Sequence, residues 1–298
     1  MTIKAESLKV PVSILVPTLN EEKNLGYCLK AVADWADEIV VVDSSSTDKT
    51  EEIAKQYRAT FVHFEFNGGW PKKKQWALDN YPFRNEWILI LDADEVLLPG
   101  IKKEIEKSIS NSGISGYYLV FQMEFLGKKL KFSYPGLKKL VLFRKNSGRF
   151  ERRLYEEESQ AEMKQNITTG IEIHEHFLVE GKTGVLKSPV LHRNNNSLTR
   201  YIAQFNEYSS WESKVLNEGN VTIVPSLFGS QAQRRRWMKI NLLGFPGISF
   251  LYFLYNFIFK LGFLDGKAGY YFCLFKMNYM IETKAKLFEI KVKKREGI

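Results

Sequence analysis

Apolar residues in the first half of the chain gather in four short runs that recur about every 25 residues. The runs are Val12–Val16, Glu38–Val42, Thr60–Phe64 and Trp87–Leu91. Short runs rich in β-branched residues are typical of strands that are buried on both faces of a sheet. The pattern therefore predicts four buried strands in this half.

Residues at helical spacing lie between the first two runs. Leu25, Cys28, Leu29 and Val32 follow one another at steps of three, one and three residues, and Asn20 ahead of them is a candidate N-cap. Strands that alternate with helices at this spacing predict right-handed βαβ units and a parallel sheet. We therefore expect ligands to bind at the carboxyl ends of the strands.

The second half contains three further strand-like runs, Tyr117–Phe125, Lys139–Phe143 and Val185–Leu191, with short polar turns. They predict that the sheet continues into a mixed, partly antiparallel region. A helix is expected from Ser197 onward, because the apolar residues that follow it recur at helical spacing.

Composition narrows the class of protein. The chain has 298 residues, of which 44% are hydrophobic, 26% charged and 14% aromatic, as in a folded chain of one large domain or two small ones. Cys28 and Cys273 stand far apart without metal-site spacing, so neither a disulfide framework nor a structural zinc site is expected. No apolar run of signal-peptide length precedes Pro11, which fits a protein of the reducing cytosol.

The positive charge belongs to the C-terminal tail. Residues 225–298 hold 13 of the 43 Lys and Arg but only 4 of the 34 Asp and Glu, so residues 1–224 keep 30 of each sign. Within the tail, Leu242–Phe259 is a stretch of 18 residues without a charge, flanked by Arg234–Arg236 and Lys260. Its length is marginal for a bilayer span, and basic residues flank both ends. We therefore expect it to lie in one leaflet or dip into it, while a full span and a buried core helix remain open.

A basic, aromatic-rich tail also raises nucleic-acid binding as a function of another class. No RNP, KH or helix-turn-helix signature supports that function, and the apolar stretch favours lipid over nucleic acid. We therefore expect an anionic membrane surface as a partner, and no nucleic acid.

The residues that follow the strands decide the class of ligand. Pro17–Glu22 follows the first strand without a glycine, which excludes the glycine-rich turn of dinucleotide-binding domains, and no P-loop motif occurs. Asp43 ends the second strand, and Asp92, Asp94 and Glu95 follow the fourth. Closely spaced carboxylates repel one another, so Mg²⁺ or Mn²⁺ shared with substrate phosphates would relieve them.

These aspartates allow two other interpretations. A carboxylate at a strand end can simply cap the next helix. Residues 92–96 also fit the aspartate motif of haloacid-dehalogenase phosphatases, but there the motif follows the first strand, and no Gly-Asp dipeptide occurs in this chain to complete such a site.

Three blocks together resemble the GT-A core of family 2 glycosyltransferases. They are VSILVPTLNE at 12–21, EIVVVDSSSTD at 38–48 and WILILDADE at 87–95. The DADE form resembles the bacterial subgroup that contains lipopolysaccharide-core β-glucosyltransferases, and weaker blocks extend the likeness to about residue 290. The resemblance implies an α/β fold of the GT-A type, with a Rossmann-like mixed sheet and helices on both of its faces.

This fold class divides the chain into two expected parts. A GT-A catalytic domain is expected over residues 1–224, with a nucleotide-sugar half at about 10–110 and an acceptor half at about 111–224. Residues 225–298 are expected to form a basic, aromatic-rich helical region that associates with the membrane.

The resemblance also implies roles for individual residues. Asp43 would bond the uracil ring, Asp92 would lie near the ribose and the metal, and Asp94 would coordinate the metal that joins the two phosphates. The family commonly has an Arg-Asn pair where this chain has Lys74-Gln75, a departure that keeps the cation and favours phosphate contact for Lys74. The expected nucleotide-binding residues are Pro17, Thr18, Glu21, Asp43, Lys74 and Asp92.

The second half is expected to supply the catalytic base. Glu175 occupies the H-E position at which the family places a carboxylate to take the proton of the acceptor hydroxyl. A surface glutamate paired with Lys or Arg is the alternative for Glu175, and a two-histidine metal site at His174 and His176 is a weaker one. His192 matches a histidine that contacts the diphosphate or metal in the resembled subgroup, although a buried core histidine is an alternative.

Together these features lead us to expect an inverting, metal-dependent glycosyltransferase that uses Mg²⁺ or Mn²⁺. Its expected donor is a UDP-hexose, and its expected acceptor is a hydroxyl of a lipid-linked or lipopolysaccharide-core glycan on the cytoplasmic side of the bacterial inner membrane. A polyprenyl-phosphate sugar synthase would share the same GT-A half and is the main alternative, because its phosphate acceptor needs no base.

Overall fold

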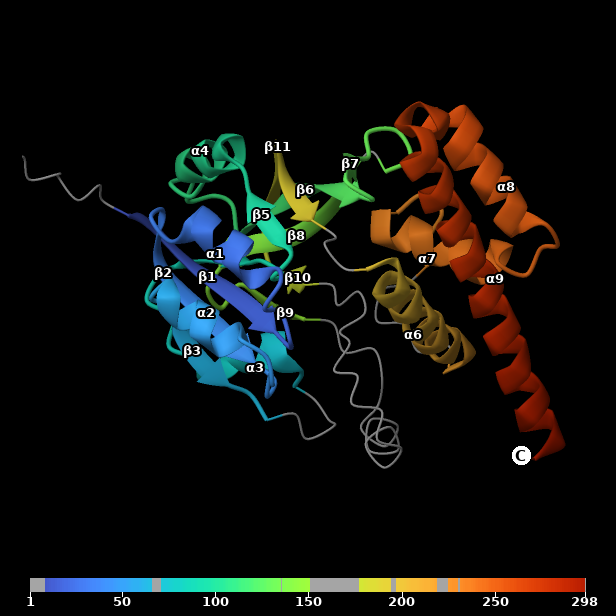
Figure 1. The fold of residues 1–298 in the computed structure, drawn as a ribbon, viewed down its shortest axis with the longest axis horizontal. Helices are drawn as coiled ribbons and strands as arrows, with labels where there is room; N and C mark the ends of the chain where they lie inside the picture. Colours follow the sequence, from blue (N-terminus) through green and yellow to red (C-terminus); the bar gives the residue numbers. More distant parts are fainter. Residues whose placement is uncertain are drawn as a thin grey trace, which may run out of the picture.

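The computed structural model describes residues 9–65, 71–134, 136–150, 177–193, 197–218, 225–229 and 231–297 (Figure 1). The elements of the nucleotide-sugar half are β1 (Val10–Thr18), α1 (Leu25–Val32), β2 (Ala36–Asp43), α2 (Thr50–Gln56), β3 (Thr60–His63), α3 (Lys73–Asn80), β4 (Trp87–Ile90), β5 (Glu95–Leu97) and α4 (Pro99–Ser108). The elements that follow are β6 (Gly116–Phe125), β7 (Lys128–Lys129), β8 (Leu137–Arg144), β9 (Gly148–Phe150), β10 (Phe177–Val179), β11 (Thr183–Arg193), α6 (Leu198–Glu218), α7 (Gln231–Leu242), α8 (Ile248–Leu254), a π-helical turn η1 (Tyr255–Phe259), a 3₁₀ turn η2 (Gly262–Asp265) and α9 (Gly266–Glu296).

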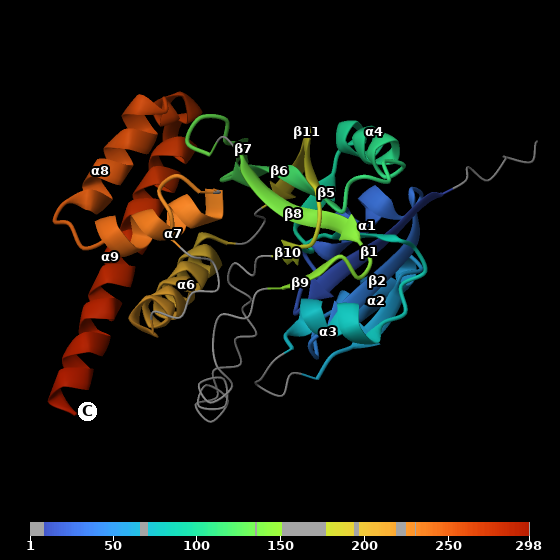
Figure 2. The ribbon, with the colours of Figure 1, turned by 180° about the vertical axis from the view of Figure 1, so that it is seen from behind.

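One mixed sheet organises the first part of the molecule. Its strand order is β3-β2-β1-β4-β8-β6-β11-β5, and β7 pairs with β6 beside this path. The first four strands in this order are parallel, whereas β8 pairs antiparallel with both β4 and β6. The expected parallel half that continues into a partly antiparallel half is therefore confirmed (Figures 1 and 2).

Helices cover both faces of the sheet, as the fold class predicted. One apolar cluster joins α1, α2 and α4 to the sheet, and its helix residues include Leu25, Leu29 and Ile105. A second cluster on the other face joins α3 to strand residues such as Leu15 and Val40. Because Leu15 and its neighbours in β1 point alternately to the two faces, this strand is buried throughout its centre.

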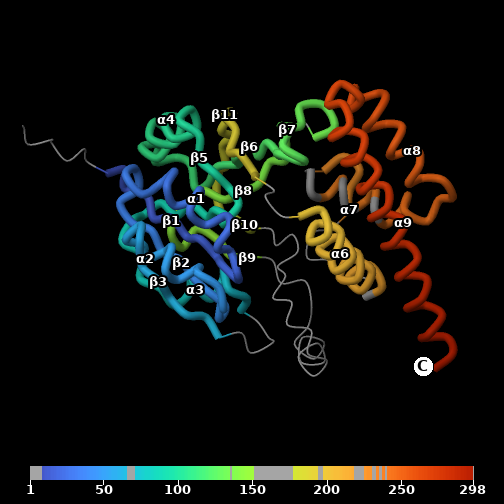
Figure 3. Tube along the Cα trace, viewed as in Figure 1, coloured from blue at the N-terminus to red at the C-terminus, as the bar shows by residue number. Residues whose placement is uncertain are grey.

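Four helices form a separate layer at one end of the sheet. Figure 3 shows α6, α7, α8 and α9 together on the side of β6 and β7, with the C-terminal end of α9 pointing away from the sheet. Phe125 of β6 contacts Tyr201 of α6 and Phe272 of α9 in a small aromatic cluster. Since α6 and α9 pack on one another, the helices on either side of residue 224 form one layer, and the division of the chain there stays a prediction.

One buried aspartate ties this helical layer to the sheet. The carboxylate of Asp265 accepts the backbone N–H groups of Lys131, Phe132 and Ser133 at 3.1, 3.0 and 2.8 Å, and the Ser133 hydroxyl at 2.6 Å. Although burial opposes it, these donors hold the pKa of Asp265 below its ordinary value. The segment after β7 is therefore fixed to the turn between α8 and α9.

The N-cap expected at Asn20 is wrong. Helix α1 begins at Leu25, and Asn20 instead has a φ of 54° in the loop after β1. Its side-chain oxygen accepts the backbone N–H of Thr47 at 2.9 Å, so Asn20 joins two loops at the carboxyl edge of the sheet. Asparagine tolerates the left-handed region better than most residues, which is why it can serve there.

No single helix in the described ranges is long and apolar enough to cross a membrane. The pair Ile248–Phe259 and Gly262–Glu296 meets that test of length and composition only when it is taken together, and it is bent by 73° at the break.

Candidate active site at the carboxyl edge of the sheet

The carboxyl ends of β1, β2 and β4 meet at one edge of the sheet. Thr18 ends β1 and Asp43 ends β2, and the two residues are register partners. The Thr18 hydroxyl donates to Oδ1 of Asp43 at 2.7 Å, and both side chains are buried. Two of the expected nucleotide-binding residues are therefore in direct contact.

The loop after β2 holds the Asp43 carboxylate from its other side. The backbone N–H of Ser46 donates to Oδ2 of Asp43 at 2.7 Å, and the Ser46 hydroxyl donates to Oδ1 at 2.5 Å. Ser45 has a φ of 60°, which turns the loop back toward the strand end. A carboxylate offers about four lone-pair directions, so the three bonds that Asp43 accepts leave one for a donor on a ligand.

The loop after β1 forms the neighbouring wall. Pro17 is still in β1, where it is paired with Val42, and Glu21 lies in the loop that follows. Burial raises the pKa of the Glu21 carboxyl, with Asn24 opposing through a hydrogen bond of 2.8 Å. Arg200 of α6 approaches Glu21 at 3.9 Å, so the first turn of α6 reaches this wall.

Asp92 lies between two lysines from different elements. Lys74 of α3 donates to its Oδ1 at 2.9 Å, and Lys139 of β8 lies 3.5 Å from its Oδ2. Although burial works against the charged form, Lys74 and Lys139 hold the pKa of Asp92 well below its usual range. Asp92 is therefore ionised and electrostatically paired.

Glu95 anchors the loop that carries the aspartates. This side chain is 1% exposed; its Oε2 accepts the backbone N–H of Asp92 at 2.9 Å and its Oε1 accepts Lys139 at 2.7 Å. Despite its burial, the pKa of Lys139 is raised by the carboxylates of Glu95 and Asp92. Lys139 and Glu95 therefore hold residues 92–95 in position.

Asp94 faces His192 across two antiparallel strands. Nε2 of His192 lies 2.9 Å from Oδ2 of Asp94, and the backbone N–H of Arg193 donates to the Asp94 carbonyl at 2.8 Å. Burial opposes protonation of the imidazole, but the Asp94 carboxylate outweighs it and raises the pKa of His192. The pairing of β11 with β5, which sets His192 opposite Glu95, brings these two side chains together.

The residues at this edge fit a divalent cation that shares its coordination with a ligand. Among the described residues, no group of three or more His, Cys, Asp and Glu side chains is arranged to hold a metal by itself. However, two donors that bind one octahedral ion at about 2.1 Å and at right angles lie about 3 Å apart, close to the 2.9 Å that separates Asp94 and His192. Mg²⁺ and Mn²⁺ commonly take one or two protein ligands and complete their shell with water and phosphate oxygens.

The lysines of α3 have distinct positions. Lys74 reaches the carboxylates through its bond to Asp92, and its expected contact with a phosphate stays a prediction. Lys73 is buried and donates to the Thr18 carbonyl at 2.5 Å. Lys73 therefore supports the end of β1 and is no part of a solvated face.

Lys139 is the site residue that sequence reasoning missed. It stood at the start of an expected strand, and nothing in the local pattern indicates that β8 runs beside β4. The available signal was electrostatic, because Asp92, Asp94 and Glu95 demand nearby cations. Its ammonium group also lies 4.5 Å from the ring centre of Phe121, a cation–π contact.

The expected base lies outside the described residues. Glu175, together with His174 and His176, belongs to a range that the structure does not describe. Its role, and the alternatives weighed for it, stay predictions.

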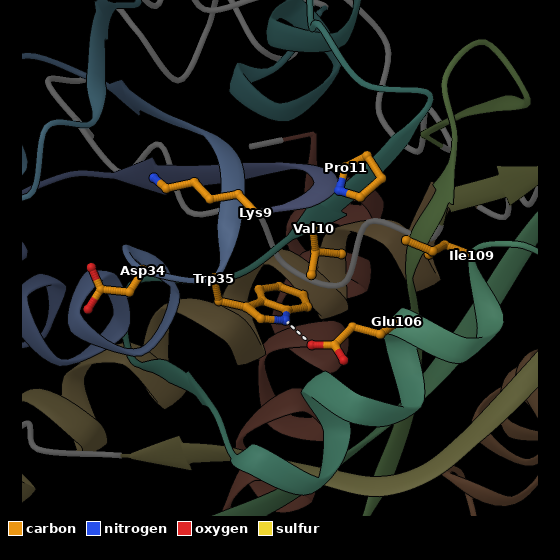
Figure 4. Close-up of a pocket in the computed structure, with 7 residues that line it drawn as sticks. All are labelled: Lys9, Val10, Pro11, Asp34, Trp35, Glu106 and Ile109. Carbon is orange, nitrogen blue, oxygen red and sulfur yellow. Dashed lines mark hydrogen bonds between the residues drawn. The ribbon is translucent and has the colours of Figure 1, made fainter. Parts of the chain in front are cut away.

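A cavity of about 450 Å³ lies at the other end of β1 (Figure 4). It is lined by Val10 and Pro11 at the start of the strand and by Trp35, whose ring N–H donates to Glu106 at 2.7 Å. Because the carboxylates stand at the opposite end of the strand, this cavity is separate from the candidate active site.

Comparison with known proteins supplies a family. The sequence model described as Glycosyl transferase family 2 matches residues 13–171, a range that contains the three blocks except for Val12 and includes both aspartates of the 92–95 loop.

Two relatives by sequence carry names that agree with this match. A protein of Rickettsia bellii (strain RML369-C), named as an uncharacterized glycosyltransferase, is 34% identical over 41% of this chain and 40% of its own length. The lipopolysaccharide core biosynthesis glycosyltransferase LpsC of Rhizobium meliloti (strain 1021) is 25% identical over 68% of this chain and 70% of its own length.

A solved structure of similar extent is the complex of S. aureus TarS residues 1–349 with UDP. It superposes with a TM-score of 0.42 at 17% identity, over 98% of this chain and 92% of that chain.

Proposed function

The chain belongs to glycosyl transferase family 2, and from this we propose that it moves a hexose from a UDP-sugar to a hydroxyl of a lipid-linked or lipopolysaccharide-core glycan. The proposed reaction inverts the anomeric centre and requires Mg²⁺ or Mn²⁺. The proposed location is the cytoplasmic side of the bacterial inner membrane, at an anionic lipid surface.

One observation carries the donor part of this proposal: the carboxylate cluster at the end of β4 is only partly neutralised. Three carboxylates, Asp92, Asp94 and Glu95, share this edge with Lys74 and Lys139. Two ammonium groups leave one negative charge beside Asp94, which the imidazole of His192 balances only while it is protonated and which a divalent cation would balance when His192 is neutral. That charge favours a divalent cation with a diphosphate bound to its open positions.

Different residues around the cluster would bind different parts of the donor. Asp43, held by Thr18 and Ser46, keeps one acceptor direction for the imide N–H of uracil. Lys74 is a flexible cation that can exchange its contact with Asp92 for a phosphate oxygen. Asp94 and His192 would hold the cation, which when bound stabilises the charge of the departing diphosphate.

Transfer to a hydroxyl also requires a base. The hydroxyl oxygen of the acceptor forms a bond to the anomeric carbon while the bond from that carbon to the UDP oxygen breaks, and the hydroxyl proton passes to a carboxylate. We assign this role to Glu175 on the family resemblance. Attack from the face opposite UDP inverts the configuration of the sugar.

Two features support the proposed acceptor. LpsC acts, by its name, in the synthesis of the lipopolysaccharide core. In this chain the net positive charge lies in residues 225–298, where cations attract anionic lipid by about 1 kcal/mol each near the surface. A tail of this kind suits an acceptor that resides in a membrane.

Product analysis tests the function directly. The purified full chain is incubated with Mn²⁺, a bacterial membrane extract and, in turn, UDP-glucose, UDP-galactose, UDP-N-acetylglucosamine and GDP-mannose, each labelled in the sugar. We expect label from one UDP-hexose in a lipid-extractable glycan, lost when Mn²⁺ is chelated. Label joined to a lipid phosphate would instead identify a polyprenyl-phosphate sugar synthase, and transfer from no UDP-sugar would contradict the proposal.

A further inference from the structure

The hairpin formed by α8, η1, η2 and the first turns of α9 has an inverted distribution of polar and apolar residues. On its inner side, Ser249 and Asn256 are each 6% exposed and Asp265 is 2% exposed. On its outer side, Phe250 is 56% exposed and Phe259 is 77% exposed. A helix in water normally buries its aromatic residues and exposes its polar ones.

The inner side packs through small residues. A Cβ atom at Gly269 would lie 2.3 Å from the carbonyl oxygen of Gly262, so only glycine allows the start of α9 to approach η2 this closely. Asn256 satisfies its side chain locally by donating to the Tyr252 carbonyl at 2.7 Å. Close backbone contact through Gly and Ser is typical of helices that pack on one another in lipid.

The outer side carries eight large apolar residues, hereafter the hairpin face. It consists of Phe250, Leu251, Tyr255, Ile258, Phe259, Leu261, Phe263 and Leu264, all at least 40% exposed. Their exposed fractions run from 44% for Leu261 to 77% for Phe259. In Figure 1 α8 is the outermost helix of its layer, on the side away from the sheet.

The charges around the hairpin face have one sign. Asp265 is the only acidic residue between positions 241 and 281, and its carboxylate is buried against the segment after β7. Lys260 lies 5.0 Å from the ring centre of Tyr255, and Lys267 and both lysines of β7 are exposed. An apolar face bordered only by cations complements an anionic lipid surface.

The dimensions exclude a span by this helix and favour an in-plane position. Helices α8 and η1 have 7 and 5 residues, or about 18 Å at 1.5 Å per residue, against roughly 30 Å for the hydrocarbon core. The tip of the hairpin is held at the sheet by Asp265, so it is not free to enter the bilayer end-on.

We propose that the hairpin face inserts into one leaflet of an anionic membrane, with α8 and η1 in the plane of the interface. The inference deepens the proposed function, because it assigns the membrane contact of that enzyme to one surface. It also excludes α8 as a buried core helix and as part of a bilayer span.

Spin labels on the full-length protein test the insertion. Nitroxides are placed at Phe259→Cys and, as a control on an exposed strand position, at Val185→Cys; the native Cys28 and Cys273 are buried. With vesicles of phosphatidylethanolamine and phosphatidylglycerol, the label at 259 should gain oxygen accessibility and lose accessibility to a water-soluble nickel complex. The label at 185 should not change. Unchanged accessibility at 259 would overturn the proposal, as would protection at 259 before vesicles are added together with a doubled mass, which would identify a second copy of this chain as the occupant.

Vesicle flotation supplies the energetic test. Phe250→Ser combined with Phe259→Ser should lower the partition coefficient by about 10²-fold, since each buried phenylalanine contributes roughly tenfold. The matched control combines Tyr118→Ser with Val185→Ser, two exposed residues on paired strands, and should float like the parent. Equal flotation of the two variants would overturn the proposal.

Neither measurement uses a nucleotide or a metal. A protein that inserts but fails to bind UDP would refute the proposed transferase and leave this inference standing. A protein that binds UDP with Mn²⁺ but does not insert would refute this inference alone.

Discussion

The sheet and the C-terminal hairpin are built for different surroundings. In the sheet, Val12, Ile14 and Leu89 are fully buried, and the charged groups gather at one edge, where they pair with one another. In the hairpin, Ser249 and Asn256 are buried, whereas Phe250 and Phe259 are exposed. Removal of apolar side chains from water stabilises the sheet. Exposed phenylalanines are unfavourable in water and favourable in contact with lipid. The comparison teaches that the proposed chemistry and the proposed membrane contact lie on separate surfaces, so substitutions should affect them separately.

The largest expected effect is a loss of turnover that leaves membrane binding unchanged. Glu175→Gln should lower turnover by about 10²–10⁴-fold, because the carboxamide keeps the shape of the side chain and loses the proton acceptor. UDP binding and vesicle flotation should both be unchanged. Steady-state transfer rates from the labelled donor measure turnover, calorimetry measures UDP binding, and flotation measures vesicle binding. Turnover close to that of the parent would move the base elsewhere or favour a phosphate acceptor.

A comparable effect, on stability instead of turnover, is expected where the aspartate loop is anchored. Lys139→Met leaves the buried Glu95 carboxylate without its partner, and breaking such a pair typically costs about 3–5 kcal/mol. The double variant Lys139→Met with Glu95→Gln should recover much of this loss, because the uncompensated charge is gone. Chemical denaturation measures both free energies of unfolding. A double variant no more stable than Lys139→Met would show that the pair is not what holds the loop.

A substitution at Asp265, which joins the two regions, should lower stability by a smaller amount, and that amount should depend on pH. Asp265→Asn removes the charge that accepts three backbone N–H groups and should cost about 1–3 kcal/mol. Because the folded pKa of Asp265 lies below its ordinary value of 3.8, its contribution is complete above that pH and is lost as the pH falls through the folded pKa. The difference in thermal stability between parent and variant should therefore shrink below about pH 4. A difference that persists unchanged at lower pH would contradict the electrostatic origin.

The smallest effect concerns the lysines around the hairpin face. Lys260→Gln together with Lys267→Gln should weaken binding to anionic vesicles by about 1 kcal/mol per lysine at low salt. This difference should fade as the ionic strength rises, because salt screens exposed charges. Flotation across a salt series measures it. A loss that does not depend on salt would mean that these lysines act through packing.

The sequence was sufficient for features that depend on local pattern. The four apolar runs became β1 to β4, although the prediction of burial is wrong for β3, which lies at the edge of the sheet and has no buried residue. Asp43 and Asp92 stand at the strand ends where parallel topology was expected to bring them. The contact between Asp94 and His192 depends instead on the antiparallel pairing of β11 with β5, between residues nearly 100 positions apart. Periodicity cannot specify that partner, and the family resemblance alone suggested His192.

Other features needed the three-dimensional arrangement. Lys139 lies in an ordinary strand pattern, and only the β4–β8 pairing brings it to Asp92. Asn20 has the chemistry of an N-cap but bonds to a loop that follows another strand. The inverted hairpin was also hidden, because a run of apolar residues does not show which side chains face α9 and which face outward. In each case a contact distant in sequence decides the outcome.

The central claim is that the carboxyl edge of the sheet binds a metal–UDP complex, and one titration tests it. UDP is titrated into the full chain by calorimetry with and without Mn²⁺, and the titrations are repeated with Asp94→Asn and with Asp34→Asn, which makes the same change at an exposed position beside the remote cavity. Loss of a metal ligand should remove several kcal/mol of stabilisation from the complex. We predict binding that requires Mn²⁺ in the parent and in Asp34→Asn, and loss of that Mn²⁺-dependent binding in a folded Asp94→Asn. Unchanged Mn²⁺-dependent affinity in Asp94→Asn would contradict the account.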